Sequence, residues 1–224
     1  MTSKYPRTYH LPWSPGVSSD DKVIDTVDYL LNVPLVITEK LDGGCCSMSN
    51  KDIFARTHSG PPTHPSFNIG KAIHASIKDQ LIDGLDYFGE YCYAKHSIHY
   101  SELPGWFLLF GIRMNSFENP KVGLWKSWTA VKSEAKRLGL PTVPELERIQ
   151  VSSAKELQKE VEKHMRLPSV YGGVREGVVV RRVEGFSDNS FDKAIAKLVR
   201  ANHVTTSKHW KSEQIIPNKL KHMA

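Results

Sequence analysis

Clusters of apolar and β-branched residues, set between Gly- and Pro-rich breaks, predict a series of short strands. The clearest cluster, residues 33–40, ends on Lys40 directly before a turn at Asp42-Gly43-Gly44. A second strand is expected to leave this turn through about Met48. Further strands are expected at 52–56, 85–91, 106–112, 176–183 and 194–199.

Helical spacing predicts helices between these strands. Asp20 and Asp21 are expected to open a short helix through about residue 31, and another helix is expected over 69–82. A buried stripe at helical spacing stops at Gly139, and a Ser153/Glu156 capping box begins a helix that runs to about residue 165. The stripe consists of Trp125, Trp128, Val131, Ala135 and Leu138. Strands separated irregularly by helices favour the α+β class.

Composition fits one globular domain. The chain has 224 residues, of which 40% are hydrophobic, and it contains no apolar run long enough to cross a membrane. We expect a single domain over 1–224, with residues 1–32 packed on it as an irregular segment and 204–224 as a basic C-terminal segment. The polar N-terminus does not resemble a secretory signal, so we expect a cytoplasmic protein.

The net charge bears on the class of partner, and the cysteine content bears on disulfides and zinc. The formal net charge of +6 favours a polyanionic partner. The three cysteines, Cys45, Cys46 and Cys92, form no CxxC pair. Reduced thiols are therefore expected, rather than a disulfide framework or a structural zinc site.

Five short segments carry the candidate chemistry, although each is a weak signal alone. A lysine before a glycine-containing turn is usually a solvated surface charge, and a glutamate at a strand end is usually just solvated. The segments are Glu39-Lys40-Leu41-Asp42-Gly43, Arg56-Thr57-His58-Ser59-Gly60, Phe88-Gly89-Glu90, Glu176-Gly177-Val178-Val179-Val180-Arg181 and Lys197-Leu198-Val199-Arg200.

In this order, the set resembles the nucleotidyltransferase motifs of ATP-dependent RNA and DNA ligases and mRNA capping enzymes. The resemblance spans residues 35–203. It implies the nucleotidyltransferase (adenylation) fold of that superfamily, with mixed, mostly antiparallel sheets flanked by helices. It also implies ATP and Mg²⁺ or Mn²⁺ as cofactors.

The resemblance assigns roles residue by residue. Lys40 matches the nucleophile that attacks the α-phosphate of ATP, and its neighbour Glu39 is assigned to the nucleotide site with it. Arg56 matches an arginine that touches the ribose or the nucleic-acid phosphate. Glu90 matches the glutamate that holds the ribose hydroxyls, and Phe110 matches an aromatic that stacks on adenine.

Two further assignments concern the phosphates and the metal. Glu176 matches the glutamate that works with the catalytic metal, and Asp42 is expected to assist it, directly or through water. Lys197 matches a lysine that contacts the α-phosphate. A lysine amine is a nucleophile only when neutral, and a nearby cation such as Lys197 is expected to favour that form of Lys40.

The pattern departs from the family in its last motif. Many members carry a second lysine where this chain has Val199, and Arg200 is the next cation. Arg200 is assigned either to the nucleotide or to a polynucleotide phosphate. In the segment after Glu90, the HxxH spacing of His96 and His99 could suggest a metal pair, but no carboxylate or cysteine accompanies it. We expect Lys95 and His96 to contact nucleic acid instead.

Several functions share these motifs. The stretch after Arg200 is too short for an OB barrel, and the segments around Glu90 and Phe110 resemble nick-sealing RNA ligases. We therefore expect a monomeric RNA ligase that seals 3′-OH/5′-phosphate breaks in RNA or RNA-containing duplexes, with no membrane partner. Whether a separate kinase or phosphatase prepares the ends stays open. The alternatives are a minimal DNA nick ligase, a GTP-using capping enzyme and a non-catalytic nucleic-acid-binding protein.

Overall fold

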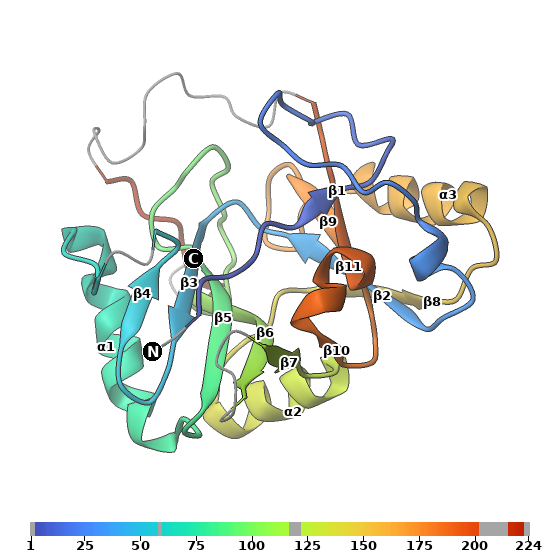
Figure 1. The fold of residues 1–224 in the computed structure, drawn as a ribbon. Helices are drawn as coiled ribbons and strands as arrows, with labels where there is room; N and C mark the ends of the chain where they lie inside the picture. The colour runs from blue at the N-terminus through green and yellow to red at the C-terminus, as the bar shows by residue number, and fades with distance from the viewer. Residues whose placement is uncertain (1–2, 58–59, 117–121, 202–214, 222–224) are drawn as a thin grey trace.

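Two sheets form the framework of the computed structural model, which describes residues 3–57, 60–116, 122–201 and 215–221. The first sheet has the order β1-β11-β9-β2-β8 and the second the order β10-β7-β6-β5-β3-β4 (Figure 1). The first comprises β1 (Tyr9–His10), β2 (Leu35–Lys40), β8 (Glu145–Ile149), β9 (Gly177–Arg182) and β11 (Ile195–Val199). The second comprises β3 (Gly44–Met48), β4 (Ile53–Ala55), β5 (Leu85–Tyr91), β6 (Phe107–Asn115), β7 (Gly123–Trp125) and β10 (Phe186–Ser187).

All strand pairs in these two sheets are antiparallel except β1 with β11, which run parallel. Four α-helices accompany them within the described residues. They are α1 (Asn68–Ile77), α2 (Trp128–Leu138), α3 (Ala154–Met165) and α4 (Phe191–Ala194). Short 3-10 turns lie at Asp28–Leu30, Pro65–Phe67, Lys78–Gln80 and Asp188–Ser190. The predicted α+β class with mostly antiparallel sheets is therefore confirmed.

Alternation along the strands of the first sheet divides the core in two. Successive strand side chains point to opposite faces. Leu35 and Ile37 of β2 pack in one cluster with Leu157 and Val161 of α3. Val36, between them, joins the larger cluster that includes residues of the second sheet and of α2. The second sheet therefore meets only one face of the first, and α3 covers the other.

Several predicted elements appear with small shifts at their ends. Ser153 caps α3 by accepting a hydrogen bond from the backbone N–H of Glu156 at 3.3 Å, as the capping box predicts. Gly139 ends α2 with a left-handed φ of 66°, which glycine adopts without steric cost. The five residues of the predicted stripe, from Trp125 to Leu138, are buried as expected.

The helix expected over 20–31 is wrong, since only Asp28–Leu30 makes a helical turn there. The backbone of this segment pairs with β1 instead of forming helical hydrogen bonds. The N–H of His10 bonds to the carbonyl of Lys22, and the N–H of Ile24 bonds to the carbonyl of His10. The helix expected to include Trp125 instead begins at Trp128, because Ser127 caps it there, and Trp125 lies in β7.

Strand β8 was missed because it reads Glu-Leu-Glu-Arg-Ile and carries no apolar cluster. Part of the basic segment 204–224 lies outside the described residues, as do His58 and Ser59. The three cysteines are free thiols. No helix in the described ranges has the length and apolarity of a membrane span.

Candidate active site

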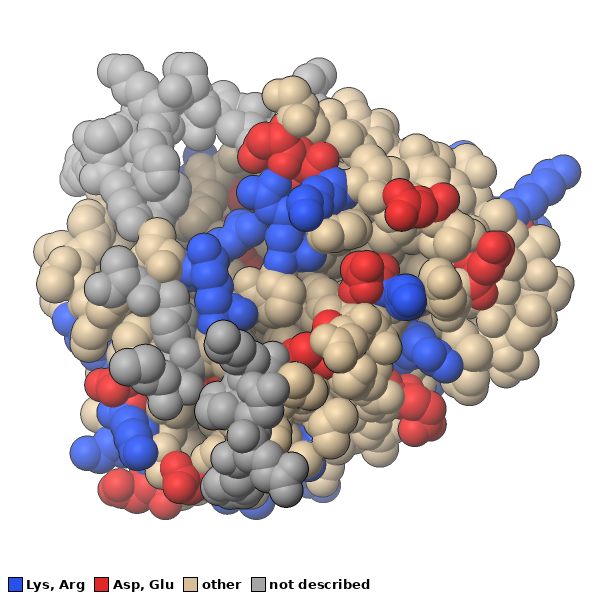
Figure 2. Space-filling model, in the orientation of Figure 1, with Lys and Arg blue, Asp and Glu red and all other residues tan. Residues whose placement is uncertain are grey.

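A cavity of about 520 Å³ opens between the two sheets. Its lining from the first sheet includes Thr38, Lys40, Val179, Arg181 and Lys197, and its lining from the second includes Gly44, Cys45, Ala55, Glu90 and Phe110. These strands bring together side chains that are far apart in the sequence. On the face drawn in Figure 2, basic side chains gather near the region where the two sheets meet.

Lys40 ends β2 and forms an ion pair with Glu176, which lies directly before β9. Its Nζ donates hydrogen bonds to both carboxylate oxygens of Glu176, at 2.7 and 2.8 Å. Lys40 is paired with Gly177 across β2 and β9, which brings its side chain next to that of the preceding residue, Glu176. Burial alone would lower the pKa of Lys40, but Glu176, Glu90 and Asp42 outweigh it and raise that pKa above its usual value. Lys40 is therefore held as an ammonium: Lys197 repels it, since each amine lowers the pKa of the other, but the carboxylates outweigh this cation.

Glu90 on β5 faces the same charges. Its Oε1 accepts a hydrogen bond of 3.2 Å from the N–H of Gly43. Burial and the neighbouring carboxylates raise the pKa of Glu90 to about 8, although Lys40 opposes the shift. A Cβ on Gly43 would lie 2.8 Å from the carbonyl oxygen of Tyr91, so the turn fits against β5 only with glycine at this position.

Asp42 turns away from Lys40 to bind the backbone. Its Oδ2 accepts hydrogen bonds of 2.7 Å from the N–H groups of both Ser97 and Ile98. Its own N–H donates to the hydroxyl of Tyr100 at 2.8 Å. Asp42 thus fastens the loop 94–100 to the turn that follows β2. Within the described ranges, no group of three or more His, Cys, Asp or Glu residues could hold a metal ion, and this includes the segment with His96 and His99.

Lys197 lies on β11 and lines the cavity. Burial lowers its pKa, and Lys40 acts in the same direction, while Asp21 opposes the shift. Arg200 follows this strand but lines a separate hollow with Trp13, Met165 and Arg166 rather than the cavity.

The remaining predicted nucleotide residues differ in position. Phe110 lines the cavity, and its ring centroid lies 5.0 Å from that of Tyr5. Arg56 is exposed at the rim. Glu39 is buried, and its carboxylate lies 3.4 Å from Arg175 and accepts a hydrogen bond from the N–H of Val170. Glu39 is therefore part of the cavity lining, but its carboxylate is engaged with Arg175 and the backbone rather than with Lys40.

The two residues predicted to contact nucleic acid also separate. His96 lines the cavity, whereas Lys95 does not, and the backbone N–H of Lys95 bonds to the carbonyl of Ile216. Both residues lie on the loop 94–100, which Asp42 fastens to the turn after β2. His96 therefore lies beside that turn. The roles assigned to both residues stay predictions.

The sequence analysis missed several residues of the cavity. Tyr5, Arg7, Asp20 and Asp21 reach it from the irregular N-terminal segment, where no periodic pattern marks them. Arg181 could have been found, since it alternates with Val180 in the strand after Glu176. Its guanidinium is buried, bonds to the carbonyl of Phe110 and lies 5.1 Å from the ring centroid of Trp128.

Comparisons with known proteins give a consistent result. The family model described as RNA ligase matches residues 33–199. A search of curated proteins found no match. Among solved structures, Naegleria gruberi RNA ligase with PPi is 18% identical with a TM-score of 0.53, and its match covers 89% of this chain and 61% of that one. A variant of the same ligase with ATP and Mn is 16% identical with a TM-score of 0.56, covering 94% of this chain and 59% of that one.

An archaeal ATP-dependent RNA ligase is 17% identical with a TM-score of 0.55, and the match covers 88% of this chain and 48% of that chain. This chain thus spans less than two thirds of the length of these solved proteins. At such low identity the likeness shows a shared fold.

Proposed function

Since this chain belongs to the RNA ligase family, we propose that it joins RNA ends at the expense of ATP through a covalent lysyl-AMP on Lys40. The substrate is a break with a 3′-OH and a 5′-phosphate in RNA or an RNA-containing duplex. The nucleotidyltransferase domain comprises the whole of 1–224 in this proposal. The solved relatives with ATP and Mn support the choice of nucleotide and of a divalent cation.

The observation that supports the proposal is the placement of Lys40 in a cavity large enough for a nucleotide. The volume of about 520 Å³ lies within the range of small-molecule sites. Phe110 and Tyr5 offer aromatic surface for a base, while Lys197 and Arg56 offer positive charge for phosphates. The lysine amine lies among these groups, so one bound nucleotide would present its α-phosphate to it.

The chemistry then follows three displacements at phosphorus. The Nζ of Lys40 forms a bond to the α-phosphorus of ATP, and the bond to pyrophosphate breaks. An oxygen of the RNA 5′-phosphate next takes the AMP, which breaks the P–N bond and frees Lys40. The 3′-OH finally attacks that 5′-phosphate, forms the phosphodiester and releases AMP. Positioning and charge stabilisation supply most of the catalysis in such transfers.

Lys40 must lose a proton before the first displacement. In the structure Glu176 holds it as an ammonium at 2.7 Å. The ion pair with Glu176 is the main contribution that raises the pKa of Lys40, so its loss would leave burial to favour the neutral amine. The amine becomes nucleophilic once the proton has moved and the ion pair is broken.

The residues around Lys40 fit a divalent cation. The carboxylate of Glu176 lies 2.7 Å from Nζ of Lys40, beside the amine that would attack the nucleotide. Mg²⁺ usually takes one or two carboxylates together with substrate phosphates rather than an all-protein cage, so Glu176 would hold it. When bound, the cation would neutralise the phosphates and compete with Lys40 for Glu176. Asp42 acts in this arrangement chiefly through the loop it fastens.

Intact-mass measurement after incubation with ATP and Mg²⁺ tests the proposal. We expect the protein to gain one AMP with ATP but not with GTP, and peptide mapping to place it on Lys40. Lys40→Ala should abolish the adduct and the sealing of ordinary ends, yet retain some sealing of pre-adenylated ends, because only the first step uses the amine. Lys51→Ala, at an exposed lysine outside the cavity, is the matched control.

A panel of nicked duplexes then identifies the substrate. We expect sealing when RNA lies on at least one side of the break. Sealing restricted to all-DNA nicks would instead identify a DNA ligase. An adduct that survives Lys40→Ala would overturn the assignment of the nucleophile.

A further inference from the structure

The N-terminal segment lies directly along the strand that carries Lys197. Tyr9 and His10 pair in parallel with Ala196 and Lys197 of β11. The N–H of Leu11 donates to the carbonyl of Lys197 at 2.8 Å, so the segment follows the strand past this residue. The chain then loops back, and Val23 forms a bridge with His10.

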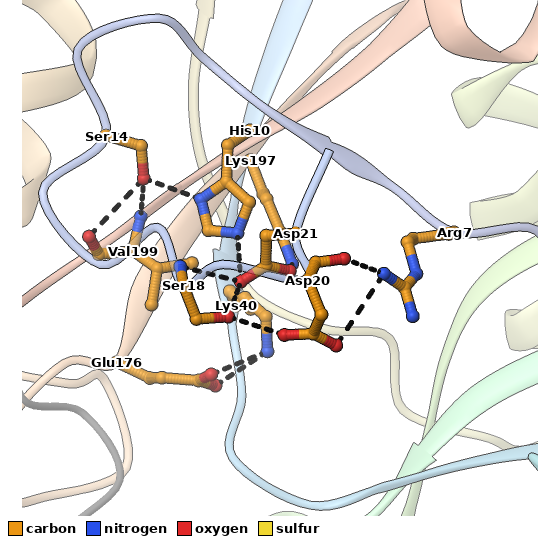
Figure 3. A network of polar contacts seen from close by, with 10 residues as sticks. All are labelled: Arg7, His10, Ser14, Ser18, Asp20, Asp21, Lys40, Glu176, Lys197 and Val199. Atoms are coloured by element: carbon orange, nitrogen blue, oxygen red, sulfur yellow. Dashed lines mark hydrogen bonds and ion pairs between the residues drawn. The ribbon is translucent and has the colours of Figure 1, made fainter. Parts of the chain in front are cut away.

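This loop brings a carboxylate to the ammonium of Lys197. The Nζ of Lys197 donates to Oδ1 of Asp21 at 3.4 Å, as Figure 3 shows. The side chains of Lys197 and Asp21 are 17% and 20% exposed, so solvent screens the pair only in part. Both residues line the nucleotide cavity.

Other groups fix the carboxylate of Asp21 in turn. Its Oδ2 accepts hydrogen bonds from the backbone N–H of Ser18 at 3.2 Å and from its hydroxyl at 2.7 Å. Nε2 of His10 lies 3.3 Å from the same oxygen, and Nδ1 of this buried ring lies 2.8 Å from the hydroxyl of Ser14. Ser14 also accepts a hydrogen bond from the N–H of Val199 at 3.0 Å. The network therefore returns to β11, two residues beyond Lys197 (Figure 3).

Asp21 carries a negative charge in this setting. Burial would raise its pKa, but the hydrogen bonds from Ser18 and the charges of Lys197 and His10 outweigh burial and lower that pKa well below the usual value. A permanent carboxylate therefore faces Lys197 at neutral pH.

From these contacts we propose that Asp21 is a positioning residue, which holds the ammonium of Lys197 where it meets the α-phosphate of the bound nucleotide. The inference rests on the proposed adenylation of Lys40. It assigns a mechanistic part to the N-terminal segment, which lies before the region that the RNA ligase family model matches.

Physical reasons favour positioning over simple neutralisation. A lysine side chain has a long flexible stem and loses considerable rotamer entropy when it is fixed. A contact already made in the empty cavity removes part of that cost from the reaction itself. An ammonium has three N–H donors, and the bond to Asp21 uses one, which leaves two for phosphate oxygens.

The first test measures the rate of lysyl-AMP formation in single turnover, with Mg²⁺ and a range of ATP concentrations. Asp21→Asn preserves the shape but removes the charge. We expect its rate at saturating ATP to fall roughly ten- to a hundredfold, with a smaller change in the half-saturating concentration. Asp25→Asn removes the same charge from an exposed position of the same segment, outside the cavity lining, and should keep the wild-type rate.

The second test follows Lys197 without any turnover. Amine acylation as a function of pH, mapped by peptide mass spectrometry, reports its protonation. Lys40, Glu176 and Asp21 face this amine, and Asp21 raises its pKa. Asp21→Asn should therefore lower the pKa of Lys197 and speed its acylation, whereas Asp25→Asn should not. An unchanged acylation profile of Lys197 in Asp21→Asn would show that the two side chains do not interact and would overturn the inference.

The outcomes distinguish a failure of the proposed function from a failure of the role inferred for Asp21. If the wild-type protein forms no lysyl-AMP, the proposed function fails and this inference falls with it. If it does, and Asp21→Asn reacts at the wild-type rate or faster, only the inference is overturned. Should Asp21→Asn fail to fold, Asp21→Glu retains the charge but displaces the carboxylate by one methylene. It is expected to slow adenylation several-fold, and a wild-type rate would again overturn the inference.

Discussion

Among single residues, Lys40 illustrates how opposing electrostatic effects are settled. Burial disfavours its charged form, but Glu176 at hydrogen-bonding distance and the further carboxylates of Glu90 and Asp42 favour it more strongly. The proposed nucleophile is therefore held as an ammonium, while burial and the neighbouring carboxylates raise the pKa of Glu90. Because Glu90 is buried beside two other carboxylates, its proton is bound more tightly than in an ordinary glutamate.

Glu90 should make stability depend on pH. Its pKa rises from 4.5 to about 8 on folding, so the folded state keeps a proton that the unfolded state has lost. Stability from this group is complete below the lower value and is lost as pH rises to about 8. Urea unfolding across this range should show the loss in the wild type and a flatter profile in Glu90→Gln. An equal loss in both proteins would contradict the assignment.

At the level of elements, the loop 94–100 is held from two sides. Asp42 binds the N–H groups of Ser97 and Ile98, while the buried side chain of Asn218 accepts from the N–H of Tyr100 and donates to the carbonyl of Cys92, each at 2.8 Å. The loop therefore connects the described C-terminal residues to the turn after β2. Its order depends on both contacts, because buried N–H groups are costly to leave unpaired.

Variants of Asp42 distinguish an anchor from a metal ligand. Asp42→Ala removes the acceptor of two N–H groups and should cost about 1–3 kcal/mol in the free energy of unfolding. Asp42→Asn retains one acceptor oxygen and should lose less. If Asp42 is chiefly an anchor, the Mg²⁺ concentration that half-saturates adenylation should change little in the Asn variant. A large increase in that concentration would show that Asp42 binds the cation.

For the whole molecule, the two sheets place positive charge around one opening. Arg7, Arg56, Lys40 and Lys197 all line the cavity, and the chain carries a formal charge of +6. A polyanion would approach this side of the molecule favourably, because each neutralised phosphate releases counterions. The expected partner is therefore the nucleic acid whose end enters the cavity.

Binding of a nicked RNA duplex should accordingly weaken by at least about tenfold between roughly 50 and 200 mM salt. Fluorescence anisotropy over a salt series measures the slope of log Kd against log salt. Arg56→Ala should lower that slope by about one if Arg56 contacts a phosphate. An unchanged slope would instead limit Arg56 to the nucleotide or to the rim.

Much of the fold was predictable because it is encoded locally. Strand β5 has its predicted bounds, and the capping box at Ser153 starts α3 as expected. Lys40, Glu90 and Phe110 were each expected at a strand, and each lines the cavity. The failures share a cause: the segment 20–31 and strand β8 take their conformation from pairing with distant strands, which no local pattern records.

The sequence by itself determined the RNA ligase motifs, their order and the strand ends that present them, because turn chemistry and side-chain alternation act over a few residues. Only the tertiary structure decided which neighbouring groups act together. It engaged the carboxylate of Glu39 with Arg175, placed Arg200 outside the cavity, directed Asp42 to a loop and brought Asp21 to Lys197 across 176 positions. Such contacts depend on how the sheets and the N-terminal segment pack, and packing joins residues whose separation along the chain carries no signal.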